Sequence, residues 1–184
     1  QLRIGVNFHK SSLLSATALD FDIFAITYDS NREALSIDDC CTYCHPWAAN
    51  GAVKLVHPTL SSSEDCFDGA LDLELSEEMP ESVNRIVIGA CVAKTSPRRP
   101  QYYLDALETA EIGLESNSMA LGLHYHLPSG SGAKKRTIYL VELQKHDGKW
   151  HLHVDGKMAK GGMQTVLKQH KINVDLDTLA IQNS

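Results

Sequence analysis

The most constraining feature of this chain is a series of short apolar runs, each closed by a cluster of turn-forming residues. Residues 85–92 are almost continuously apolar, as in a strand that is buried on both faces. Residues 71–75 read Leu-Asp-Leu-Glu-Leu, and this strict alternation indicates one buried and one wet face. Asn50-Gly51 and Asp147-Gly148 are typical of tight hairpin turns. The sequence therefore predicts a mainly β domain.

The number and spacing of these runs favour a particular β architecture. About eight short strands with turns every ~8–12 residues are typical of a β-sandwich. We find no linker long enough to divide residues 1–184, so we expect a single domain. The expected strands cover residues 19–27, 53–57, 71–75, 85–92, 110–114, 119–127, 138–143 and 150–154.

Helical signals are few. Met163, Val166, Leu167 and His170 follow the i, i+3, i+4, i+7 spacing of a short amphipathic helix. Gly161-Gly162 precedes them and reads as the junction between a loop and that helix. Residues 101–108 follow a proline that suits a helix start, so two further helical turns are expected there. The predicted fold class is a β-sandwich with a short C-terminal helix.

Composition excludes several classes of function. The 184 residues carry 17 basic and 23 acidic side chains, a net charge of −6. A nucleic-acid-binding domain needs a basic face, so no nucleic-acid partner is expected. No apolar run reaches the ~20 residues of a membrane helix, so no direct membrane insertion is expected. Five cysteines, an odd number, suit a reducing compartment and predict a cytoplasmic location.

A C-x-x-C-H string runs from Cys41 to His45. This spacing can attach a c-type haem, through two thiols and an axial histidine. With Cys40 added, the string also offers thiolate and imidazole ligands to zinc, although no second C-x-x-C supplies the remaining ligand. The third interpretation, and the one we favour, is a strand that carries half-buried thiols, because cysteine is among the residues most often buried.

Two H-x-H strings offer another route to a metal site. They are His124-Tyr125-His126 and His151-Leu152-His153. Residues i and i+2 of a strand share a face, so each pair presents two imidazoles on one side. If these strands form a meander with residues 138–143 between them, the pairs lie about 9–10 Å apart, which is too far for one ion. A zinc-dependent enzyme that uses these pairs is the alternative function.

Acidic side chains gather at three places along the chain. Hard cations such as Ca²⁺ take six to eight oxygen ligands, usually from carboxylates on neighbouring loops. The sequence contains no G-x-S-x-G elbow, no phosphate-binding glycine loop and no H-E-x-x-H, so we do not expect an enzyme. The candidate calcium ligands are Asp20, Asp22, Asp38, Asp39, Glu64, Asp65 and Asp68.

Several segments in order resemble the TerD-like tellurium-resistance and stress-protein family. The first is the Asp-x-Asp strand at residues 19–23, followed by the acidic turn at Asp38-Asp39. The most specific is the closing pattern of residues 141–174, in which Gly148 and Trp150 precede the Gly161-Gly162 pair and a final Asn-Val. The resemblance covers about residues 19–174.

The resemblance implies a calcium-binding β-sandwich linked to tellurite resistance and stress tolerance, with no established catalytic activity. It also implies a scaffold role beside other stress-response proteins, with no small-molecule ligand identified. The family's calcium loop corresponds to residues 58–69, which keep Glu64, Asp65 and Asp68 but lack the Gly-Asp-Asn string. The best matches to the family's calcium ligands are Asp22, Asp65 and Asp68. We expect calcium binding to be weaker than in typical members or lost.

Overall fold

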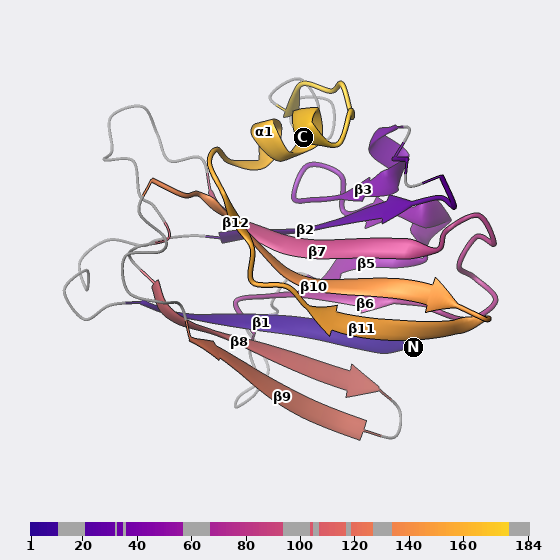
Figure 1. Ribbon diagram of the computed structural model, residues 1–184, viewed down its shortest axis with the longest axis horizontal. Coiled ribbons are helices and arrows are strands. Elements are labelled where there is room, and N and C mark those ends of the chain that lie inside the picture. Colours follow the sequence, from indigo (N-terminus) through magenta and orange to yellow (C-terminus); the bar gives the residue numbers. More distant parts are fainter. Residues whose placement is uncertain are drawn as a thin grey trace.

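The computed structural model contains two antiparallel β-sheets packed face to face, with one short helix outside them (Figure 1). The residues that the structure describes are 1–10, 21–31, 33–34, 36–56, 67–93, 104, 107–116, 119–126 and 134–176. The predicted fold class, a β-sandwich with a short helix near the C-terminus, is confirmed. None of the helices in these ranges is both long and apolar enough to cross a membrane.

Sheet I has the strand order β4-β5-β6-β1-β8-β9, and its strands β1, β8 and β9 are the lowest in Figure 1. All of its strand pairs are antiparallel. Its strands are β4 (Trp47–Ala48), β5 (Val53–Val56), β6 (Gly69–Leu73), β1 (Leu2–Lys10), β8 (Leu107–Ser116) and β9 (Met119–His126).

Sheet II has the strand order β11-β10-β7-β2-β3, with β12 paired to β10. Two short 3-10 helices, η2 (Ile37–Asp39) and η3 (Ala49–Gly51), lie before and after the β3–β4 segment. The strands of sheet II are β11 (Lys149–Val154), β10 (Thr137–His146), β7 (Arg85–Val92), β2 (Phe21–Tyr28), β3 (Cys40–Cys41) and β12 (Met158–Ala159).

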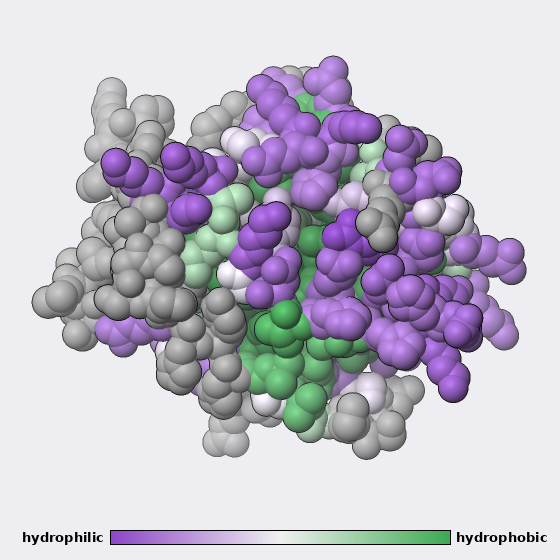
Figure 2. All heavy atoms as spheres, in the orientation of Figure 1, coloured by the Kyte–Doolittle hydropathy of each residue, from purple (hydrophilic) through white to green (hydrophobic). Residues whose placement is uncertain are grey.

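The main core lies between the sheets and follows from strand alternation. In β1, Ile4, Val6 and Phe8 are buried while the residues between them lie on the outer face of sheet I. In β7, Ile86 and Ile88 enter the same core from sheet II. At the open edge between β9 and β11, the inward residues Leu121 and Val154 stay nearly half exposed, and apolar side chains gather at this edge in Figure 2.

A second core covers the outer face of sheet II. Helix α1 (Met163–Gln169) lies on that face and buries Met163, Val166 and Leu167 against it. Phe24 of β2 is fully buried there, and its ring occupies the space that a side chain at Gly89 would need. Because β2 and β7 are covered on both sides, they read as nearly continuous apolar runs.

The predicted strands and C-terminal helix are present with small shifts in their ends, and β7 has the predicted bounds. Two expectations differ. No strand was predicted before residue 19, yet β1 occupies the centre of sheet I. The helix predicted for residues 101–108 is wrong at its end, because β8 begins at Leu107. There, pairing of Leu107 with Lys10 of β1 outweighs the local proline signal.

Candidate functional site

The predicted calcium ligands fall into two groups. Asp20, Glu64 and Asp65 lie outside the described residues. Asp22, Asp38, Asp39 and Asp68 are described, and they occupy three separate places in the fold.

Asp22 lies on the outer face of sheet II, at the start of β2. It lines a cavity of about 330 Å³ beside the start of α1, together with Arg136 and Asp175. Met163 and Leu176 add apolar wall, and the polar Gln164 and Thr165 also line it. The Arg136 guanidinium donates from Nη2 to the carbonyl oxygens of Val92 and Ala93, both at 3.3 Å. The cavity therefore combines two carboxylates, one cation and an apolar wall.

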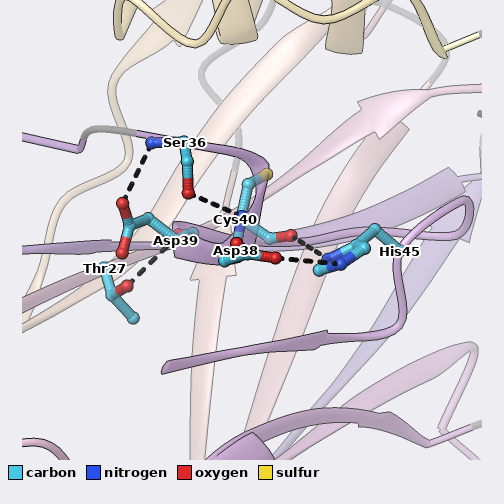
Figure 3. A network of polar contacts seen from close by, with 6 residues as sticks. All are labelled: Thr27, Ser36, Asp38, Asp39, Cys40 and His45. Carbon is cyan, nitrogen blue, oxygen red and sulfur yellow. Dashed lines mark hydrogen bonds and ion pairs between the residues drawn. The ribbon is translucent and has the colours of Figure 1, made fainter. Parts of the chain in front are cut away.

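Asp38 and Asp39 form the turn at the other end of β2 (Figure 3). The Asp39 carboxylate accepts the backbone N–H of Ser36 at 3.1 Å, and the Ser36 hydroxyl accepts the N–H of Asp38 at 3.1 Å. This reciprocal pair is a capping box. Thr27 donates its hydroxyl to the Asp39 carbonyl at 3.3 Å, which fixes the turn to β2. The Asp39 carboxylate thus has a structural task.

His45 completes this network. Its Nδ1 lies 3.1 Å from the Cys40 carbonyl oxygen, and its Nε2 lies 3.7 Å from an Asp38 carboxylate oxygen. Figure 3 shows the Cys40 sulfur pointing away from the imidazole. Since both ring nitrogens of His45 face protein oxygens, the ring ties the turn together and does not face the Cys40 thiol.

Asp68 lies in sheet I, immediately before β6. Its carboxylate accepts the backbone N–H of Phe8 at 2.7 Å, and its own N–H donates to the Asn7 side chain at 3.0 Å.

The described candidate ligands do not converge on one point. Asp22 and Thr27 are five positions apart on β2, and Thr27 contacts Asp39, so Asp22 and Asp39 are separated by roughly 17 Å. Within the described ranges, no group of three His, Cys, Asp or Glu side chains could hold a metal ion. A calcium site shared with Asp20, Glu64 or Asp65 stays a prediction.

The cysteines of the C-x-x-C-H string are more buried than predicted. Cys41 faces the core between the sheets, whereas Cys40 and Cys44 join the second core under α1. All three are free thiols, as is Cys91. Thr42 and His45 close a tight turn by exchanging two backbone hydrogen bonds, at 2.8 and 3.0 Å. The two sides of the string therefore belong to two different cores.

Burial controls the chemistry of these thiols. It raises the pKa of Cys41 to about 12 and the pKa of Cys91 to about 12, because a thiolate there would lose its hydration. It also raises the pKa of Cys40 above the ordinary value. A thiol reacts as its thiolate, so burial disfavours the reactive form of these three side chains.

The two H-x-H pairs lie in different sheets, so the meander considered for them does not form. His124 and His126 belong to β9 of sheet I, and His151 and His153 belong to β11 of sheet II. Leu152 packs against the main core, so His151 and His153 are on the outer face of sheet II. The register pairs His124 with Glu111 on the outer face of sheet I. Since the pairs lie on opposite outer faces, one ion cannot bind both.

One polar network was not predicted from the sequence. His170, at the end of α1, lies between the hydroxyls of Tyr28 and Tyr139, with Nε2 at 3.3 Å from the latter. Burial lowers the pKa of His170, and the nearby charges of Arg85 and Lys157 lower it further. His170, Tyr139, Arg85 and Lys157 line a cavity of about 320 Å³. The residues are up to 142 positions apart, so no local pattern could have found them.

The fold and these sites define a class of β-sandwich protein whose second sheet is closed by a C-terminal helix. The model of one family, the TerD domain, matches residues 1–170, and the chain belongs to this family. No curated protein matches the sequence.

Two solved structures share the fold. One is SAV2460, a protein of unknown function, with a TM-score of 0.66, 16% identity and coverage of 89% of this chain and 92% of that chain. The other is SCO6318 from Streptomyces coelicolor A3(2), a homologue of telluride resistance protein (TerD), with a TM-score of 0.63, 11% identity and coverage of 90% and 93%. At these identities the likeness shows the fold alone.

Proposed function

We propose that this chain is a non-catalytic binding or scaffold module of the tellurium-resistance type, acting in the cytoplasm beside other stress-response proteins. The observation that carries the proposal is the TerD-domain match over residues 1–170, together with the two-sheet fold. The buried, high-pKa thiols and the doubly engaged His45 are consistent with a role in binding and not in nucleophilic chemistry.

Tellurite survival tests this function. The chain is expressed in a bacterium that lacks its own TerD-type genes, and colonies are counted on graded potassium tellurite. We expect survival to rise relative to an empty vector, and to fall back with Phe24→Asp, which places a charge in the second core. Equal survival with and without the folded chain would contradict the proposal.

Calcium binding in this proposal is weak or lost. The carboxylates of Asp39 and Asp68 already accept backbone N–H groups, and Asp22 lies on a different sheet from Asp68. A thermal melt in millimolar calcium and in chelator measures the effect, since a ~100-fold excess over Kd stabilises by about 2.7 kcal/mol. We expect little or no shift. A large shift abolished by Asp65→Ala with Asp68→Ala would show an intact loop site, and one that survives this double change would place the ion elsewhere.

A further inference from the structure

Helix α1 ends at a histidine that lies between two tyrosines of sheet II. The backbone N–H of His170 donates to the carbonyl oxygens of Val166 and Leu167, at 3.0 and 3.1 Å, and this ends the helix. The ring nitrogen Nδ1 contacts the Tyr28 hydroxyl, and Nε2 lies 3.3 Å from the Tyr139 hydroxyl. Both tyrosines are buried in the second core, which α1 covers (Figure 1). The ring therefore fastens the end of α1 to β2 and β10.

This fastening requires a neutral imidazole. A neutral ring has one nitrogen that donates and one that accepts, so one tyrosine hydroxyl accepts from His170 and the other donates to it. An imidazolium has two donors and no acceptor, so the tyrosine that donates loses its partner. Burial lowers the pKa of His170, and the nearby charges of Arg85 and Lys157 lower it further. The packed arrangement thus disfavours the proton through both its hydrogen bonds and its charges.

The carboxylates near His170 already have other partners. Glu142 accepts two hydrogen bonds from Arg85, at 2.7 and 2.9 Å, and Asp155 accepts the backbone N–H of Lys157 at 3.3 Å. These donors compete with an imidazolium for both carboxylates. The titratable groups around His170 are Tyr28 of β2, Arg85 of β7, Tyr139 and Glu142 of β10, Asp155 and Lys157 between β11 and β12, and Lys168 and Lys171 beside it in the chain.

The packing of α1 is separate from the contact between the two sheets. The helix has seven residues, and a helix this short depends on tertiary packing for its stability. It buries Met163, Val166 and Leu167 in the second core, whereas the main core between the sheets is a different cluster of residues. Proteins open locally in units of this kind, at a lower free energy than global unfolding. Loss of α1 from its place therefore leaves the main core intact.

We propose that α1 is an acid-released cover: protonation of His170 detaches α1 from sheet II while the two sheets stay packed. Below about pH 6.5 a solvent-exposed histidine binds a proton. The open form therefore gains a proton that the closed form resists, and the open population rises as the pH falls. Opening uncovers the apolar outer face formed by Phe24, Ile26 and Val87. This switch is independent of the proposed scaffold role.

The buried cysteines can report the opening. Cys44 and Cys91 belong to the second core, and the Cys44 thiol donates to the Leu176 carbonyl, beyond α1, at 3.7 Å. Cys41 belongs to the main core and serves as the internal control. The full 184-residue chain is treated with dithiodipyridine at pH 7 and at pH 5, and peptide mass spectrometry gives the labelling rate of each thiol. Each rate is divided by that of the urea-unfolded chain at the same pH.

We expect labelling of the two second-core thiols, relative to Cys41, to rise several-fold from pH 7 to pH 5. Each unit of pKa difference between the open and closed forms contributes up to about tenfold. His170→Gln keeps a hydrogen-bonding side chain that does not titrate, so its ratio should be the same at both pH values. Lys157→Gln, an exposed change that removes a cation near His170, should give a smaller rise. His151→Gln removes an exposed histidine of β11 and should behave like the unmodified chain.

A ratio that does not change with pH in the unmodified chain would overturn the switch, as would a rise that persists in His170→Gln. An equal rise at Cys41 would also contradict it, because the sheets would then separate together with α1. If His170→Gln does not fold, the comparison of Lys157→Gln with His151→Gln decides, and equal rises in these two variants count against the switch. None of these results would alter the tellurite survival on which the proposed function depends.

Discussion

The two outer faces of this sandwich each carry an arginine–carboxylate pair of the same geometry, but only the outer face of sheet II is covered by another element. On sheet I, Arg3 donates to Asp72 through Nε and Nη2 at 2.7 and 2.9 Å. On sheet II, Arg85 donates to Glu142 with the same two distances. Arg85 also lies over the Tyr28 ring, 5.0 Å from its centroid, within the region that α1 and its following residues cover. The same ion pair is therefore a surface feature on one face and part of a packed layer on the other.

The sequence explains this difference. Strand β1 alternates between apolar and polar residues, so one face stays wet. Strand β2 carries Phe24, Ile26 and Tyr28 on the side that β1 leaves polar, and it must be covered by another element. Helix α1 supplies that cover. Sheet II thus uses its outer face for stability, whereas β1 keeps polar side chains on the outer face of sheet I.

Truncating one phenylalanine on each outer face should give the largest difference in stability between the two sheets. Phe24 is fully buried on the outer face of sheet II, and Phe24→Ala should lower the free energy of unfolding by about 3–5 kcal/mol. Phe67 lies over Gly113 on the outer face of sheet I but is only partly buried, so Phe67→Ala should cost clearly less. Chemical denaturation measures both. Equal losses would show that the second core is not closed by α1.

The two arginine–carboxylate pairs should show the same contrast between the faces, with a smaller difference in the free energy of unfolding. Arg85→Ala should cost about 1–3 kcal/mol, because it removes a cation over Tyr28 and leaves a half-buried carboxylate without its partner. Arg3→Ala should cost at most about 1 kcal/mol, as is typical of exposed pairs. Urea unfolding at two salt concentrations tests this. The account would be wrong if Arg3→Ala proved the more damaging change.

The smallest expected effect concerns pH. The pKa of His170 is lowered below its ordinary value by burial and by Arg85 and Lys157, and its ring faces Tyr28 and Tyr139. Below about pH 6.5 the unfolded chain binds this proton while the folded chain resists it. Stability should therefore fall as the pH decreases from about 6.5 towards the folded pKa. His170→Gln should lessen this loss relative to the unmodified chain in melts at pH 7 and pH 5. An unchanged loss would show that His170 does not contribute.

Local patterns predicted the parts of the fold that depend on periodicity. β7 could be predicted because its residues are apolar throughout, and α1 because Met163, Val166 and Leu167 keep helical spacing. β1 was missed even though Leu2, Ile4, Val6 and Phe8 alternate.

The candidate sites depend on register and could be predicted only in part. The acidic pattern placed Asp22, Asp39 and Asp68 together, but the fold places Asp22 in β2, Asp39 in η2 and Asp68 just before β6. The H-x-H spacing at His124 was visible in the sequence. Its pairing with Glu111 follows only from the order β1-β8-β9 in sheet I.

The most direct test of the contrast between the two faces is amide hydrogen exchange followed by NMR on ¹⁵N-labelled protein. One experiment then reports on both sheets under identical conditions. We predict that the amides of β2 and β7, whose outer face lies under α1, exchange more slowly than those of β1 and β8, whose outer face is largely polar. Equal protection in the two sheets, or slower exchange in sheet I, would contradict the division into a covered face and an exposed face.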